Sequence, residues 1–167
     1  MLPSIRGMSS FLLLALSPSA YADTATLSIT GRVLPGTCVL TVPSITLPPV
    51  KANDLVERDN LLQPATLELA SCVGVTQASL TFDGVAEAFD NELWKNTATT
   101  GAAINVSFAV LEGTTGTTYI QKGTTLTVPV AGGTASQPIR VGYYRTGSPG
   151  ITAGVMSADI TVTASYQ

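Results

Sequence analysis

The sequence contains no histidine and few charged residues, and these two absences narrow the chemistry open to it. Charged side chains make up 11% of the 167 residues, and the formal net charge is −3. No basic patch is present that would attract nucleic acid. Without histidine, a Ser-His-Asp or Cys-His catalytic arrangement and a histidine-held metal centre cannot form. The common hydrolase mechanisms and nucleic-acid binding are therefore excluded.

Paired carboxylates are the one catalytic arrangement that the composition leaves open. Four acidic residues lie close together in the sequence and could in principle act as an acid and a base, as in glycoside hydrolysis: Asp83, Glu87, Asp90 and Glu92. We interpret them instead as the solvated face of a loop between two strands. The glycine-rich stretches lack the lysine and the strand-to-helix context of a phosphate-binding loop. We therefore expect no enzyme activity, no cofactor and no metal site.

The first 22 residues have the pattern of a secretory signal peptide. Arg6 precedes an apolar run from Phe11 to Leu16, and Pro18 and the sequence Ala-Tyr-Ala at 20–22 follow. The apolar run is too short to span a bilayer, and the small residues match an A-x-A cleavage site. We expect residues 1–22 to be removed on export, so that the mature chain begins at Asp23.

Only two cysteines are present, Cys38 and Cys72. In an exported chain a single pair most often forms a disulfide, and a metal site would need further ligands that the sequence lacks. Closing a loop of about 35 residues would stabilise the fold by about 3 to 4 kcal/mol on the chain-entropy model. We predict a structural disulfide between them.

Threonine, valine and alanine are abundant, and 15 glycines and 10 prolines punctuate the chain, a composition that favours strands and turns. Several short segments alternate apolar with polar residues, which is the period of a half-buried strand. Their spacing predicts a single β-sandwich domain. The apolar positions of the clearest segments are Leu67 and Leu69; Leu80 and Phe82; Ile104, Val106, Phe108 and Val110; and Ala158, Ile160, Val162, Ala164 and Tyr166.

Two stretches do not fit this pattern. Residues 87–96 carry Phe89, Leu93 and Trp94 at helical spacing, which indicates either a short helix or an irregular loop that covers a sandwich edge. Residues 43–55 are rich in proline but too short and too apolar for a domain boundary. We interpret them as an extended segment at the edge of a sheet.

The two ends of the mature chain carry a resemblance to a known family. The stretch ATLSITGRVLPGTC, residues 25–38, alternates apolar positions and places Gly31 seven residues before the first cysteine. ATLELASC, residues 65–72, is an alternating strand that ends in the second cysteine. GYYRTGSPGITAGVMSADITVTASYQ, residues 142–167, contains an aromatic strand, a Thr-Ala-Gly turn and a last alternating strand with Tyr166 next to its end. Together these motifs resemble the structural subunits of chaperone-usher pili, the type 1 fimbrial family.

The resemblance implies an all-β fold, an incomplete immunoglobulin-like sandwich (the pilin fold) that a donor strand from a neighbouring subunit completes. Residues 23–34 would be the N-terminal donor-strand extension and residues 35–167 the pilin domain. The donor positions would be Ala25, Leu27, Ile29, Gly31 and Val33. The acceptor edge, which a periplasmic chaperone would occupy first, would include Ile160, Val162, Ala164 and Tyr166.

The resemblance also implies a function and partners. Such subunits polymerise head to tail by donor-strand exchange at an outer-membrane usher, which builds an adhesive pilus on the cell surface. The chaperone, the usher and other pilus subunits would be the partners, and nucleic acid would not. A glycine in the donor strand lets its backbone lie close to the acceptor.

Other interpretations remain open from the sequence. The N-terminal strand could fold back as an ordinary first strand, which would give a self-contained periplasmic β-sandwich that binds a small ligand or a glycan. A tip adhesin would need a lectin domain of roughly another 100 to 150 residues ahead of the pilin domain. A hydrolase based on carboxylates is the remaining alternative.

Overall fold

The structure is a computed structural model that describes residues 27–34, 36–147 and 150–167. The chain divides into two units, residues 1–33 and residues 34–167. In the first unit, residues 27–33 are described as chain without helix or strand. The expected signal peptide and donor position Ala25 lie outside the described residues.

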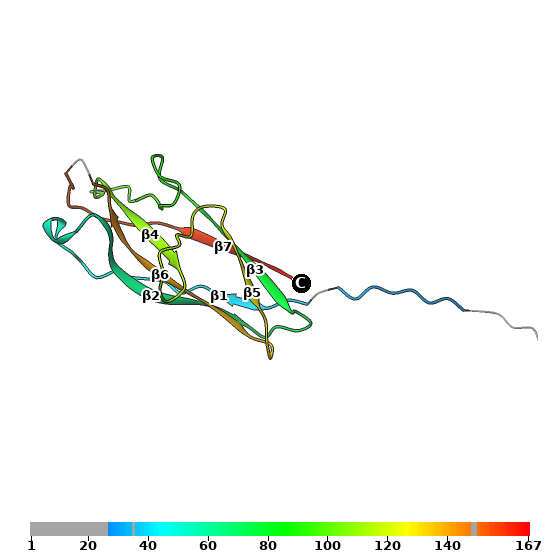
Figure 1. The fold of residues 1–167 in the computed structure, drawn as a ribbon. Coiled ribbons are helices and arrows are strands. Elements are labelled where there is room, and N and C mark those ends of the chain that lie inside the picture. Colours follow the sequence, from blue (N-terminus) through cyan, green and yellow to red (C-terminus); the bar gives the residue numbers. More distant parts are fainter. Residues whose placement is uncertain (1–26, 35, 148–149) are drawn as a thin grey trace, which may run out of the picture. The chain divides into compact units, whose positions relative to one another are not determined.

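The described residues of the second unit form seven strands and one turn of 3-10 helix (Figure 1). Its elements in chain order are β1 (Val39–Thr41), η1 (Ala52–Asp54), β2 (Arg58–Ala70), β3 (Gln77–Gly84), β4 (Val106–Glu112), β5 (Thr125–Pro129), β6 (Ala135–Arg145) and β7 (Ile160–Tyr166).

The strands form two sheets. One sheet has the order β1-β2-β6-β4 and the other β5-β3-β7, and all neighbouring strands run antiparallel. In β2 the register shifts between Asn60 and Gln63, opposite Gly142 of β6. A Cβ atom at Gly142 would press against the Asn60 carbonyl oxygen and Leu62, so the bulge requires glycine there. The prediction of an all-β sandwich is confirmed.

The main core lies between the two sheets and uses the alternating positions that the sequence indicates. Leu67 and Leu69 of β2 and Leu80 and Phe82 of β3 are all buried within it. Trp94 joins them, and its indole Nε1–H donates a hydrogen bond of 2.8 Å to the Ile120 carbonyl oxygen. Because each sheet contributes one face, period-two patterning was a sound guide to this core.

Residues 87–96 form an irregular loop, one of the two alternatives left open above. Trp94 forms a backbone bridge to Phe108 and so extends the sheet beyond β4, with hydrogen bonds of 2.9 Å in both directions. Leu93 packs with Ala109 and Leu111 into a second, smaller cluster of buried residues. Helical spacing was therefore a poor guide here, because Trp94 packs into the main core and Leu93 into the smaller cluster.

The strand expected to include Ile104 begins only at Val106. Asn105 has a φ of 61°, a left-handed conformation that interrupts a strand. Ile104 is exposed and pairs instead with Thr152. Over the described ranges, no helix has the length and apolar character needed to cross a membrane.

Candidate functional site

An apolar groove lies between β7 and the chain that follows β1. Its cavity has a volume of about 590 Å³. One wall is the segment 42–47, which we call the groove wall, and the other is residues 156–160 and Val162. The floor consists of Leu67, Phe82, Phe108, Val110, Ile139, Val141 and Tyr143.

One wall of the groove is the edge of a sheet, and the other is a segment that belongs to no strand. β1 is the outermost strand of its sheet and pairs with β2 as far as Thr41, which is opposite Glu68, so residues 42–47 lie beyond this ladder. β7 is likewise outermost in its own sheet and has only β3 as a strand neighbour. An outermost strand presents N–H and C=O groups that can pair with a further strand. The groove is therefore bordered by the free edge of β7 and by residues 42–47, with apolar side chains between them.

The floor of the groove is made by residues that already belong to the main core. Leu67 and Phe82 are each 1% exposed, and Val110 is 2% exposed. Ile160 and Val162 of β7 are half-buried and pack against the same core. A strand laid in the groove would thus continue the core and would not cover a separate patch.

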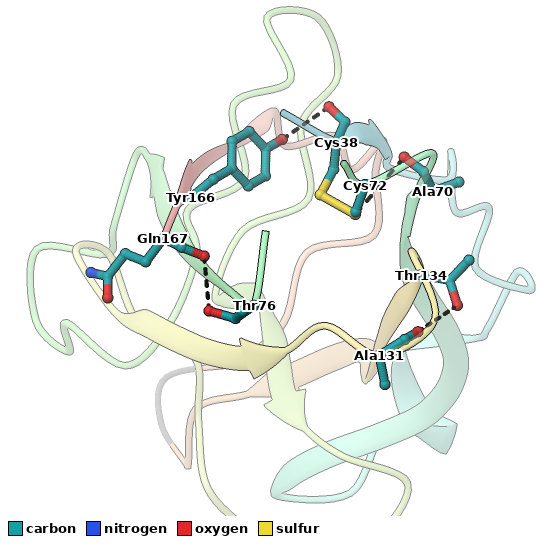
Figure 2. The surroundings of a disulfide bond; sticks show 8 residues. All are labelled: Cys38, Ala70, Cys72, Thr76, Ala131, Thr134, Tyr166 and Gln167. Atoms are coloured by element: carbon teal, nitrogen blue, oxygen red, sulfur yellow. Dashed lines mark hydrogen bonds between the residues drawn. A yellow bond between two sulfur atoms is a disulfide. The ribbon is translucent and has the colours of Figure 1, made fainter. Parts of the chain in front are cut away.

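Beyond the groove, Tyr166 holds the end of β7 against the first strand. Its hydroxyl donates a hydrogen bond of 3.2 Å to the Cys38 carbonyl oxygen, which ties the end of β7 to the start of β1. Figure 2 shows the ring of Tyr166 beside the disulfide. Beyond it, the Gln167 carbonyl oxygen accepts hydrogen bonds from the N–H groups of Thr76 (2.7 Å) and Gln77 (3.1 Å).

The disulfide between Cys38 and Cys72 is present, as the sequence predicts (Figure 2). It joins the residue before β1 to the loop after β2. Gly36 lies against this junction, and a Cβ atom there would collide with the Val73 carbonyl oxygen. The start of the domain is thus fixed by a covalent bond and by close backbone contact.

The structure separates the four expected acceptor positions into two groups. Ile160 and Val162 line the groove. Ala164 and Tyr166 pack against the main core near β1, where the sandwich is already closed. The open part of the groove is therefore shorter than β7.

The expected donor positions that are described have exposed side chains. Leu27 and Ile29 are each 83% exposed, and Val33 is 97% exposed. Gly31 has open space around it, since a Cβ atom there would meet nothing within 4 Å. Three large aliphatic side chains at alternate positions thus lie in solvent.

The four acidic residues considered above have separate local partners. Asp83 forms an ion pair of 3.3 Å with Lys122, and its pKa is lowered by a hydrogen bond from the Gly84 N–H and then by Lys122. Two further hydrogen bonds involve the loop residues. Ser107 Oγ of β4 donates to Glu87 Oε1 (2.8 Å), and the Glu92 N–H donates to Asp90 Oδ1 (3.0 Å) within the loop. In the part of the chain that is described, no group of three or more acidic or cysteine side chains is placed to hold a metal ion.

The groove wall is the part of the site that sequence reasoning did not identify. Residues 43–55 were interpreted as an edge segment, but nothing in their pattern indicated that they border a cavity. The available signal was the apolar set Val42, Ile45 and Leu47 directly after the first cysteine strand, interrupted by Pro43. Proline breaks the period-two pattern on which strand recognition depends.

Several solved structures share this fold. The CupB6 tip adhesin from Pseudomonas aeruginosa aligns with a TM-score of 0.64 and 20% identity over 78% of this chain, which spans 38% of that protein. The P pilus rod subunit PapA aligns with a TM-score of 0.63 and 16% identity, covering 78% of this chain and 99% of PapA. A subunit of a chaperone-usher pilus rod aligns with a TM-score of 0.64 and 15% identity, covering 90% and 100%. At these identities the likeness concerns the fold alone.

The sequence itself gives the family. No curated protein matches it. The family described as fimbrial protein matches residues 27–167, which include every strand of the sandwich and the exposed segment before it. The chain therefore belongs to the fimbrial protein family.

Proposed function

We propose that this pilus structural subunit polymerises by donor-strand exchange, with residues 23–34 of one copy filling the groove of another. The observation that carries the proposal is the groove itself, an apolar floor between the free edge of β7 and residues 42–47. A strand added there would pair with the free edge of β7 and cover the floor in a single step. The family resemblance predicts an acceptor groove beside the last strand, and the cavity between β7 and residues 42–47 is the candidate for it.

The exposed segment has the chemistry that the groove requires. Leu27, Ile29 and Val33 alternate with polar residues, so in an extended conformation they project from one face. Each large aliphatic side chain that becomes fully buried contributes about 1.5 to 3 kcal/mol. Gly31 shares their face and would let the donor backbone approach the floor closely.

A contact of this kind is head to tail. The donor and the acceptor are different surfaces of the subunit, so each added copy presents a new groove or a new extension and the assembly grows as a filament. We propose that a periplasmic chaperone occupies the groove before assembly, that an outer-membrane usher mediates the exchange, and that the product is an adhesive fimbria on the cell surface. Residues 1–22 would serve as the export signal.

The proposal is tested by a charge placed on the donor face. We expect Ile29→Asp in the mature chain, residues 23–167, to abolish polymers, because a carboxylate would have to enter the apolar groove unpaired. The matched control is Ser28→Asp, which puts the same charge on the opposite face of the same strand and should polymerise normally. Analytical ultracentrifugation of chains refolded with the disulfide intact would measure the assembly.

The same preparation also tests the acceptor. A synthetic peptide of residues 23–34 should bind the Ile29→Asp chain and raise its melting temperature, because its own extension cannot fill the groove. The Ile29→Asp peptide should not. Normal polymers from the Ile29→Asp chain, or a wild-type chain that stays monomeric and binds no peptide, would overturn the proposal.

A further inference from the structure

The chain from residue 42 to residue 50 forms the groove wall and its continuation, and very little holds it in place. It follows the last paired residue of β1, Thr41, and precedes η1. Among the described residues, no backbone hydrogen bond joins this segment to either sheet. Most of it is exposed to solvent. A free segment of this kind would be expected to move unless a side chain fixes it.

One side chain does fix it. The Tyr143 hydroxyl donates a hydrogen bond of 3.1 Å to the Pro48 carbonyl oxygen. The ring of Tyr143 stacks on Phe108, with centroids 6.3 Å apart and planes at 25°. Phe108 in turn is held by two backbone hydrogen bonds to Trp94. This hydrogen bond, which we call the tether, therefore connects the segment to the paired strands β4 and β6.

Tyr143 also stands where two cavities meet. A second cavity of about 310 Å³ continues past the groove, and the two share three lining residues, Leu47, Tyr143 and Met156. Pro48 and Pro49 follow Leu47 and have no N–H to offer a partner strand. The segment therefore offers no backbone donor at these two positions, next to the hydrogen bond from Tyr143.

We propose that Tyr143 is a positioning residue that holds the groove wall away from β7, so that the groove is open before a donor strand arrives. The inference rests on the proposed function, and it adds to that function the residue that pre-forms the site. The Tyr143 hydroxyl is protonated at neutral pH and can donate, because the ordinary pKa of tyrosine is 10.0 and burial raises the pKa of Tyr143 further.

The physical reason is the apolar character of the wall. Val42 and Ile45 are partly exposed beside an apolar floor. Without the tether, the wall can settle onto the floor and bury these side chains, which would narrow the entrance for a donor strand. In the filled groove the donor strand itself would hold the wall, so the tether would matter little there. Tyr143 should thus affect association far more than dissociation.

The test compares Tyr143→Phe with Tyr144→Phe, both in the Ile29→Asp mature chain so that polymerisation does not interfere. Tyr144 is the next residue of β6 and packs with the second cluster on the other face of the sheet, so its hydroxyl is a matched control. Binding of a fluorescent peptide of residues 23–34 is followed by stopped flow. We expect Tyr143→Phe to lower the association rate constant about fivefold, the value of one neutral hydrogen bond, with dissociation changed by less than about twofold.

Hydrogen exchange supplies a second measurement. Tyr143→Phe should accelerate amide exchange in residues 42–50 of the unfilled chain and not in the peptide complex, whereas Tyr144→Phe should change neither. An association rate equal to that of the parent chain, or a change confined to dissociation, would overturn the role of Tyr143 while leaving the proposed function intact. A parent chain that binds no peptide would overturn the proposed function, and this role with it.

Discussion

At the scale of single residues, Gly154 lies where the loop at residues 101–103 packs against the chain that leads to β7. The Val155 N–H bonds to the Gly101 carbonyl oxygen at 2.7 Å, and the Ala103 N–H bonds to the Val155 carbonyl oxygen at 2.9 Å. A Cβ atom at Gly154 would collide with the backbone of residues 101–103. The glycine of the Thr-Ala-Gly turn therefore permits close packing of two backbones.

Asn96 reinforces the same junction. Its side-chain amide donates hydrogen bonds to the carbonyl oxygens of Ala103 and Val155, and its oxygen accepts them from the N–H groups of Ala98 and Ser157. One side chain thus satisfies four backbone groups, and it holds in place the chain that leads into β7.

We expect Gly154→Ala to destabilise the chain by about 1 to 3 kcal/mol, because the added methyl group forces two backbones apart. Gly150→Ala is the matched control, since a Cβ atom there would meet nothing within 4 Å and the residue lies four positions away. Urea denaturation of both variants in the Ile29→Asp background would measure the difference. Equal stabilities would show that the junction yields without strain.

At the scale of elements, the disulfide compensates for a short strand. β1 pairs with β2 at three positions only, Val39 to Thr41. The bond between Cys38 and Cys72 closes a loop with a sequence separation of 34 residues around that ladder. The edge of the groove thus depends on a covalent closure as much as on hydrogen bonds.

Replacing both cysteines by alanine should lower the free energy of unfolding by about 3 to 4 kcal/mol, since the unfolded chain regains the entropy of an open loop. Chemical denaturation under non-reducing conditions would measure this loss. The control is the wild-type chain with a reductant, which should show a similar loss. A loss below about 1 kcal/mol would mean that the three-residue ladder suffices by itself.

The same elements show how far the sequence alone could lead. Leu67, Leu69, Leu80 and Phe82 bury one face of each strand, and a one-sided strand has a visible period of two. β4 is buried on both faces, so Ala109 and Leu111 gave no such signal and the second cluster was not foreseen. The groove wall was missed for a different reason. It borders a cavity, and prolines interrupt the alternation of apolar and polar residues along it.

At the scale of the whole molecule, the absence of histidine determines how stability depends on pH. Both cysteines are in the disulfide, so no side chain with an ordinary pKa between about 5 and 9 can titrate. Burial raises the pKa of Tyr119 and of Tyr143 above the ordinary value of 10.0. Such a group contributes stability below its unfolded pKa, and this is lost as the pH rises through its folded value. For Asp83, whose pKa is lowered, the contribution is lost as the pH falls.

We therefore expect the melting temperature to be nearly constant from about pH 5.5 to 9, with a decline above about pH 10 as the buried tyrosines are forced to ionise. Scanning calorimetry across this range, with absorbance at 295 nm to follow tyrosinate, would measure both effects. In Tyr143→Phe the alkaline decline should be smaller. A transition near pH 6.5 would contradict this account, since no side chain in the sequence has an ordinary pKa near that value.

The position of the disulfide has a mechanical consequence for the proposed filament. Tension on the extension enters the domain just before β1 and meets Cys38 first. From there a covalent path leads through Cys72 into β2, whose long ladder with β6 resists being sheared. The three pairs of β1 and the loosely held wall after it are bypassed. In the proposed filament the disulfide would carry tension into β2, so that pulling on one subunit would not open the groove that holds the strand of its neighbour.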